Sequence, residues 1–90
     1  MKFDIYFKEV GFHLSHLDPK FKGETTCMPV VGDFIDYELQ YKEDCVIISC
    51  KVVERIHYLQ DDLVMLKVEI SDKEVLDDLN NYIKVAGKAK

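Results

Sequence analysis

Apolar and polar residues alternate with a period of two through residues 45–59 and again through residues 63–70, with the polar segment 60–62 between them. Both runs are rich in Val, Ile, Leu and Tyr, which fit the pleated, half-buried surface of a β-sheet. The pattern therefore predicts a long β-hairpin with one dry and one wet face. The dry face is expected to hold Val46, Ile48, Cys50, Val52, Ile56, Tyr58, Val64, Leu66, Val68 and Ile70. The wet face is expected to hold Ser49, Lys51, Arg55, His57, Lys67 and Glu69.

Two more segments alternate in the same way and are expected to be strands. Residues 2–10 place Phe3, Ile5 and Phe7 on one face, and residues 34–40 place Ile35, Tyr37 and Leu39 on one face. A hairpin loop at residues 41–44 gives three apolar pairs, which are Leu39 with Val46, Tyr37 with Ile48, and Ile35 with Cys50. Apolar cross-strand pairs stabilise a sheet, so this register is favoured over its neighbours. A loop at residues 60–62 then pairs Tyr58 with Val64 and Ile56 with Leu66, which completes a meander.

The predicted strand 45–59 is too long to be straight. At roughly 3.3 Å per residue it would extend about 50 Å, against about 17–20 Å for an ordinary strand. Its alternation also falters at Val52, Val53 and Glu54, because Glu54 falls on the dry face. A β-bulge or bend at this point would let one strand pass between two sheets of a small barrel.

The segment 11–33 lacks a steady period and contains several turn-forming residues, so we expect a long first loop that is partly ordered. Its apolar residues are expected to pack over one end of the sheet; they are Phe12, Leu14, Leu17, Phe21 and Met28. Residues 72–86 show helical spacing of apolar residues instead, at Val75, Leu76, Leu79, Tyr82 and Ile83. Ser71 and Glu74 match a capping box, which places the start of this helix.

Together these patterns predict a single domain over residues 1–90, mainly β (α+β). It is a small antiparallel β-meander or SH3-like barrel with strands at about 2–10, 34–40, 45–59 and 63–70. A C-terminal helix at about 72–86 is expected to cover the barrel or sheet. A chain of 90 residues supports one small core.

The composition is that of a protein that we expect to be cytoplasmic. No apolar run approaches the length of a bilayer span, and the charged residues Asp4, Lys8 and Glu9 interrupt what would be the apolar part of a secretory signal. The three cysteines are Cys27, Cys45 and Cys50. Since Cys45 and Cys50 have opposite parity on one strand, we expect reduced thiols.

Metal binding is the alternative that the histidines raise. The candidate ligands are His13, His16, Cys27 and His57. Imidazole and thiolate are suitable zinc ligands, but common zinc signatures contain a second closely spaced pair, which this chain lacks. A nucleophilic role for Cys27 with His13 or His16 has no support beyond the residue types. We therefore expect no catalytic residue and no cofactor.

RNA binding is a further alternative, because small β-barrels often bind RNA through basic and aromatic residues on one sheet face. Lys51, Arg55 and Lys67 are the residues for this role, together with His57. The net charge of −5 opposes it, since binding to phosphates needs clustered basic side chains.

An apolar strip on the wet face supports the leading hypothesis. It consists of Phe34, Ile47, Val53, Leu63 and Met65. Exposed apolar surface of this kind is typical of interaction sites. We therefore expect a non-enzymatic interaction module that binds a protein partner or a second copy of itself, with no membrane and no nucleic acid involved. Covering of the strip by the helix or the long loop is the alternative.

Three motifs along the meander also carry a resemblance. They are Pro29-x-Val31-Gly32-Asp33-x-Ile35, then Lys51-Val52-Val53-x-Arg55-x-His57, and the closing Val64-x-Leu66-x-Val68. The pattern is similar to that of small uncharacterised bacterial and phage-associated proteins with an SH3-like β-meander. It covers about the middle half of the chain. The resemblance implies a small barrel and no established activity.

Overall fold

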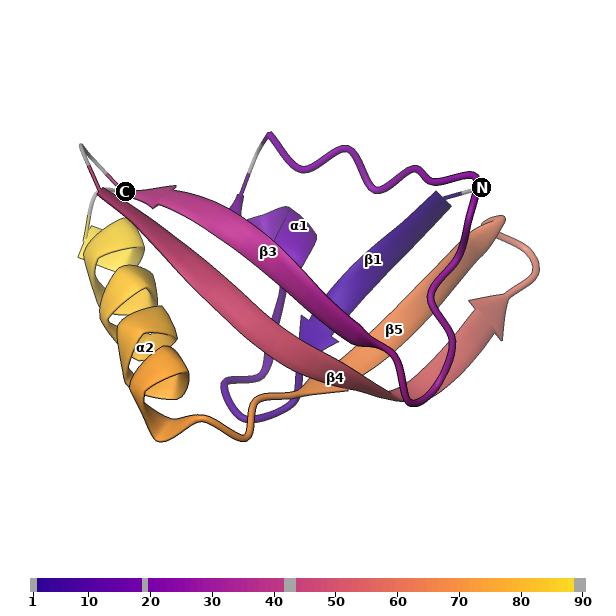
Figure 1. The fold of residues 1–90 in the computed structure, drawn as a ribbon. Helices are drawn as coiled ribbons and strands as arrows, with labels where there is room; N and C mark the ends of the chain where they lie inside the picture. Colours follow the sequence, from indigo (N-terminus) through magenta and orange to yellow (C-terminus); the bar gives the residue numbers. More distant parts are fainter. Residues whose placement is uncertain (1, 19, 42–43, 89–90) are drawn as a thin grey trace.

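The alternating segments of the chain form one five-stranded sheet. The computed structural model describes residues 2–18, 20–41 and 44–88. Its elements are β1 (Lys2–Phe7), β2 (Phe12–His13), α1 (Leu14–Leu17), β3 (Phe34–Tyr41), β4 (Asp44–Tyr58), β5 (Leu63–Glu69) and α2 (Lys73–Lys88). The strand order is β2-β1-β5-β4-β3 (Figure 1). The prediction of a mainly β chain with a C-terminal helix is confirmed.

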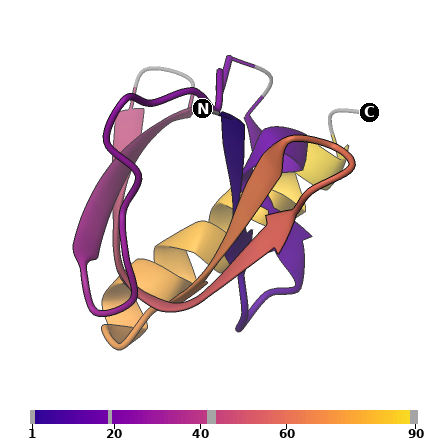
Figure 2. The ribbon, with the colours of Figure 1, turned by 90° about the vertical axis from the view of Figure 1, so that its right-hand side faces the viewer.

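β4 is the strand that both halves of the sheet share. Its first half pairs with β3 and its second half pairs with β5, both antiparallel. The sheet curves strongly along this strand, so that the β3–β4 hairpin and the β1–β5 pair form two sides of the molecule (Figures 1 and 2). The predicted bend in this long strand is therefore present, and the bend allows β4 to pair with β3 on one side of the molecule and with β5 on the other.

The sheet departs from the predicted antiparallel barrel in two ways. β1 runs parallel to β5, so the sheet is mixed and not wholly antiparallel. Within the described residues the sheet is also open, because β2 and β3 lie at its two ends and do not pair with each other. The ring of Phe21 lies between β1 and β3 instead, with edge-to-face contacts to Phe3 (5.4 Å between centroids) and Tyr37 (5.7 Å). Side chains, not strand pairing, therefore close the curved sheet.

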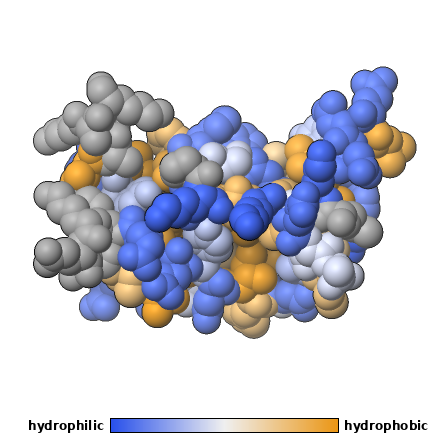
Figure 3. All heavy atoms as spheres, turned by 90° about the horizontal axis from the view of Figure 1, so that it is seen from above, coloured by the Kyte–Doolittle hydropathy of each residue, from blue (hydrophilic) through white to orange (hydrophobic). Residues whose placement is uncertain are grey.

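The segment 11–33 is more ordered than a single loop. It holds β2 and α1, and Leu14 and Leu17 are buried in the core. The coil 20–33 that follows α1 then crosses to the start of β3, and hydrophilic side chains run across this side of the surface (Figure 3). Gly23 anchors the coil, because its carbonyl accepts a hydrogen bond from the Phe3 N–H at 2.8 Å.

β1 ends at Phe7, three residues before the predicted strand end at residue 10. The N–H groups of Val10 and Gly11 both donate to the Phe7 carbonyl, at 3.3 and 2.9 Å, which turns the chain back. Gly11 has a φ of +71°, a conformation that favours glycine. The turn brings β2 alongside β1, where Tyr6 pairs with His13.

The register of the first hairpin is confirmed. Ile35 pairs with Cys50, Tyr37 with Ile48 and Leu39 with Val46. The pairing extends to Tyr41 and Asp44, which lie in strands and not in the predicted loop 41–44; residues 42 and 43 lie outside the described part.

The register of the second hairpin differs from the prediction by one residue. Leu66 pairs with Arg55 and Val64 pairs with His57, not with Ile56 and Tyr58. The cause is the bulge expected near Val53, since the register shifts between Val52 and Glu54. One extra residue reverses the parity of the rest of the strand, so Arg55 and His57 share the face of the core residues. Ile56 and Tyr58 lie on the other face.

The core lies between the curved sheet and the two helices. Its buried members come from every strand except β2, from α1 and from α2; they include Ile5, Phe7, Leu14, Leu39, Ile48, Cys50, Val52, Val64, Leu66, Val68, Ile70 and Leu79. α2 packs against β4 through Leu79, which is fully buried. No helix among the described residues has the length and apolar character needed to cross a membrane.

Asp72, not the predicted Ser71, caps α2. Its carboxylate accepts a hydrogen bond from the Glu74 N–H at 2.9 Å, and its carbonyl accepts one from the Leu76 N–H at 3.0 Å. These are the bonds expected of an N-cap residue. The helix therefore begins one residue later than the predicted 72.

Two tyrosines tie the end of α1 to the rest of the fold. The Tyr37 hydroxyl donates to the Asp18 carboxylate at 2.7 Å, and the Tyr82 hydroxyl donates to the Leu17 carbonyl at 2.9 Å. Burial raises the pKa of both phenols, and the Asp18 charge raises them further. Both tyrosines therefore stay protonated at physiological pH and hold α1 between β3 and α2.

Candidate functional site

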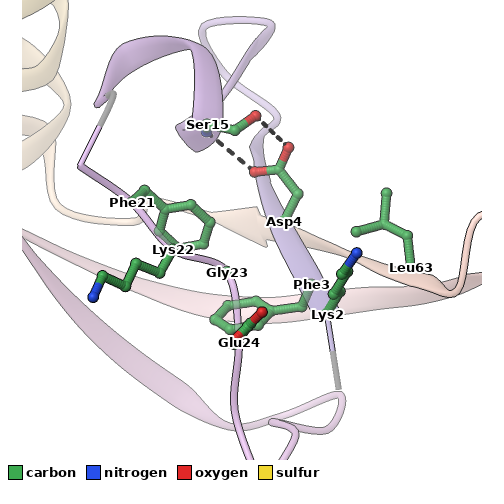
Figure 4. A pocket seen from close by; sticks show the side chains of 9 residues that line it. All are labelled: Lys2, Phe3, Asp4, Ser15, Phe21, Lys22, Gly23, Glu24 and Leu63. Carbon is green, nitrogen blue, oxygen red and sulfur yellow. Dashed lines mark hydrogen bonds between the residues drawn. The ribbon is translucent and has the colours of Figure 1, made fainter.

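A pocket beside β1 combines a concave surface with a cluster of polar side chains (Figure 4). Its volume is about 200 Å³, and its lining combines apolar and charged residues: Lys2, Phe3, Asp4, Ser15, Phe21, Lys22, Gly23, Glu24 and Leu63. Pockets that bind small molecules commonly measure about 300–1,000 Å³. This pocket is therefore smaller than a typical small-molecule site.

Asp4 in this pocket has a structural task. One of its carboxylate oxygens accepts hydrogen bonds from the N–H groups of Ile5 (2.8 Å) and Ser15 (3.2 Å), and the other accepts one from the Ser15 hydroxyl (2.6 Å). The His13 side chain makes no capping bond at the start of α1, so Asp4 supplies the cap from β1.

The neighbouring His13 does not turn this cluster into a catalytic triad. Its Nδ1 atom lies 3.8 Å from the Asp4 carboxylate and has no hydrogen-bond partner among the described residues. In a triad the imidazole lies between the carboxylate and the nucleophile. Here the Ser15 hydroxyl donates directly to Asp4, so the imidazole does not lie between the carboxylate and the hydroxyl.

The metal candidates are only partly brought together. The rings of His13 and His16 lie 5.4 Å apart between centroids. Cys27 is exposed in the coil 20–33, and His57 lies near the end of β4. In the described part of the chain, no group of three or more His, Cys, Asp or Glu side chains is arranged to hold a metal ion.

The basic residues proposed for RNA binding do not share one face. Lys51 and Lys67 lie on the outer face, where Lys67 forms an ion pair with Glu54 at 3.6 Å. The bulge turns Arg55 to the core face, and the Arg55 Nε atom is buried without a hydrogen-bond partner among the described residues. His57 faces the same way.

The tip of the β4–β5 hairpin carries two shallow hollows. Their volumes are about 180 and 320 Å³, and His57, Tyr58 and Leu59 contribute to both. Leu59 is 88% exposed and Asp62 has a φ of +51°. These features describe an open turn with an apolar side chain at its tip, without converging polar groups.

The residues of the predicted apolar strip differ widely in exposure. Phe34 is 78% exposed and Ile47 is 56% exposed, both on the outer face of the β3–β4 hairpin. Val53, at the bulge, and Leu63 are half-buried. Met65 is only 8% exposed, so it adds little to a surface that a partner can reach. The accessible part of the strip is therefore Phe34 and Ile47.

The free edge of β3 lies next to these two residues. β3 is eight residues long and ends the sheet, with β4 as its one strand neighbour in the described structure. The Val52 N–H donates to the Asp33 carbonyl at 2.9 Å, which shows that the odd-numbered residues of β3 are the ones whose backbone groups bond to β4. Antiparallel residues bond the neighbouring strand alternately. Phe34, Asp36, Glu38 and Gln40 therefore direct their N–H and C=O groups away from β4.

The same alternate residues of β3 place their side chains on the outer face. Asp36 lies opposite Ser49 and Glu38 lies opposite Ile47, so neither carboxylate faces a basic residue across the hairpin. Both side chains are exposed, and Glu38 accepts a hydrogen bond from the Gln40 side chain at 3.1 Å. Our sequence reasoning missed this pair, although the predicted register already placed both carboxylates opposite uncharged residues.

The cysteines differ in environment and are all thiols. Cys50 is buried, whereas Cys27 and Cys45 are exposed, as the opposite parity of Cys45 and Cys50 predicted. Burial, followed by the charges of Asp36 and Glu9, raises the pKa of the Cys50 thiol to about 12. A buried thiol with so high a pKa is a packing residue and not a nucleophile.

Comparisons of this chain with family models, with curated proteins and with solved structures found no match.

Proposed function

We propose that this chain is a non-enzymatic protein-interaction module. Its binding surface is the outer face of the β3–β4 hairpin together with the free edge of β3. The observation that carries the proposal is the row of outward backbone groups on β3, which have no partner among the described residues. An uncovered edge strand is a template for pairing with another polypeptide.

Phe34 and Ile47 supply the apolar contacts of this surface. Both are large and more than half exposed, and they lie on the face that continues from the free edge. Aromatic side chains are common energetic anchors of protein interfaces. The Lys51 ammonium lies 5.8 Å from the centre of the Phe34 ring, which orients the ring without covering it.

The resemblance to small phage-associated SH3-like proteins belongs to the same proposal. Its motifs lie on the coil before β3 and on β3, β4 and β5. The curved meander of these strands supports an SH3-like relationship, whereas the parallel β1 departs from a simple antiparallel barrel.

A photo-crosslinking experiment in the native host tests the proposed surface. Benzoylphenylalanine replaces Phe34 or Ile47 in separate variants, and Asn81 in a control, since Asn81 is exposed on α2 and is not part of the proposed surface. We expect the same crosslinked protein from positions 34 and 47 and none of it from position 81. Crosslinks from position 81 alone, or no adduct at positions 34 and 47, would contradict the proposal.

Metal binding is a second candidate, favoured by the closeness of the His13 and His16 rings beside Asp4. The hydrogen bonds that Asp4 already accepts count against it. Elemental analysis of protein purified without chelator distinguishes the two. Stoichiometric zinc that disappears in the His13→Ala, His16→Ala variant would support the metal candidate, and its absence would end it.

A further inference from the structure

We infer that the partner of this module is an extended polypeptide segment with Lys or Arg at alternate positions, which adds to the free edge of β3 as a further strand. This inference rests on the proposed function and specifies the chemistry of its partner. It follows from three features of β3, which are the direction of its backbone groups, its uncompensated carboxylates and its mismatch with a second copy of itself.

The backbone of β3 selects an extended segment. Phe34, Asp36, Glu38 and Gln40 direct their N–H and C=O groups to the free edge, according to the ladder phase that the Val52–Asp33 bond sets. An incoming strand can satisfy donors and acceptors at this spacing along its whole length, which a helix cannot do because its own backbone groups are already bonded. The length of β3, eight residues, matches a partner segment of similar length.

The negative charges of Asp36 and Glu38 determine which side chains the partner segment should carry. In a strand added to this edge, residues opposite Asp36 and Glu38 place their side chains on the same outer face, two positions apart. Ser49 and Ile47 leave the carboxylates without a basic partner on the other side. No salt bridge to either carboxylate is found among the described residues. Lys or Arg at alternate positions of the partner supplies the missing charges.

A second copy of β3 does not fit this edge. In a two-fold symmetric antiparallel pair, residues on the outer face oppose residues on the outer face, so the central registers bring Asp36 and Glu38 opposite each other or opposite themselves. Like charges directly opposite in a sheet are destabilising. The same carboxylates that attract a basic strand therefore protect the edge from self-pairing.

The test uses two synthetic peptides of about eight residues, matched to β3. One has lysine at every second position with threonine between, and the other has glutamate in place of lysine. Amide chemical shifts of ¹⁵N-labelled protein are followed during titration. We expect the lysine peptide to shift residues 34–41, with binding at least about tenfold tighter than for the glutamate peptide and weaker at about 0.5 M salt.

Charge-reversal variants complete the test. Asp36→Lys, Glu38→Lys should lose the lysine peptide and gain the glutamate peptide. The control Asp77→Lys, Asp78→Lys changes the net charge equally on the exposed surface of α2 and should leave the preference unchanged. The neutral variant Asp36→Thr, Glu38→Thr should self-associate more strongly than the wild-type chain in sedimentation velocity. Circular dichroism confirms that each variant is folded.

Several outcomes would overturn the inference. These are equal binding of both peptides, shifts away from residues 34–41, or an unchanged preference after charge reversal. If these occur while positions 34 and 47 still crosslink to one protein, the proposed function stands and its partner is not a basic strand. If no crosslinks form at positions 34 and 47 either, both the inference and the proposed function are contradicted.

Discussion

The two hairpins that share β4 show how one extra residue changes which side chains of a strand face the core. In the β3–β4 hairpin, alternation continues unbroken, so apolar residues pair on the core face and Asp36 and Glu38 are exposed. In the β4–β5 hairpin, the bulge at Val53 reverses the parity. Arg55 then faces the core side, and Ile56 lies on the outer face. The second hairpin therefore carries a polar group where its pattern of residues suggested an apolar one.

The two hairpins also differ in their surroundings. β5 lies between β1 and β4, so its backbone is bonded on both sides and its even-numbered residues are buried. β3 is bonded on one side and has its free edge exposed to a partner. The second hairpin thus includes a strand with neighbours on both sides, and the first includes the free edge that we propose as an interaction surface. The following predictions test this division, from the largest expected effect to the smallest.

Leu66→Ala should destabilise the protein by about 3 kcal/mol, because Leu66 is fully buried between β1 and β4 and its truncation leaves a cavity. Leu63→Ala, on the half-buried outer side of the same strand, should cost less than about 1 kcal/mol. Urea unfolding monitored by circular dichroism measures both. Equal losses would contradict the assigned faces of β5.

Gly23→Ala should destabilise by about 2 kcal/mol or more, since Gly23 has a φ of +56° and an added Cβ would clash with the Phe3 carbonyl oxygen. The substitution disturbs the coil whose Phe21 joins β1 to β3. Gly32→Ala is the matched control. It has a φ of +100° but open space around the added Cβ, so it should lose less stability in the same unfolding experiment.

Arg55→Met should leave stability unchanged or raise it by about 1 kcal/mol. The substitution removes a buried Nε atom that has no hydrogen-bond partner among the described residues, and it keeps the apolar part of the side chain against the core. Lys51→Met changes a basic residue on the outer face and should not stabilise. A loss of more than about 1 kcal/mol on Arg55→Met would indicate that Arg55 has a polar partner.

Cys50 should react far more slowly with thiol reagents than Cys27 and Cys45 in the folded protein at pH 8. Its pKa of about 12 leaves little thiolate, and its side chain is buried. Because the folded pKa exceeds that of a free thiol, 9.0 on the same scale, this group stabilises the fold below pH 9 and loses that contribution as the pH rises toward 12. Mass spectrometry after labelling should find two modified cysteines before unfolding and three after it.

Part of the candidate site could be predicted from the sequence. The apolar pairs Ile35–Cys50 and Tyr37–Ile48 determined the register of the first hairpin, and that register places Asp36 and Glu38 together on the outer face. It did not indicate that β3 ends the sheet. The edge depends on β1, which could pair with either side of the meander by its own alternation and lies parallel to β5. Strand order is decided by contacts between distant segments, which a single sequence does not contain.

The hydrogen bonds that Tyr37 and Tyr82 make with the end of α1 could not be predicted from local sequence patterns either. Phe21 and Leu17 were expected to pack over the sheet, and they do. The bonds that fix them come from Tyr37 on β3 and Tyr82 on α2, which are distant in the sequence. Local patterns also misplaced the cap of α2 by one residue, since Asp72 and not Ser71 accepts the Glu74 N–H bond.

The sequence by itself determined the four long strands, where the C-terminal helix lies and where β4 must break its alternation, because side-chain periodicity and local backbone preferences act over a few residues. The tertiary structure decided the order of the strands, the face of every residue after the bulge, and which edge stays open. These depend on contacts between segments that are distant in the sequence, such as those of Phe21 with Phe3 and Tyr37, and packing of that kind is settled only when all segments compete for the same core.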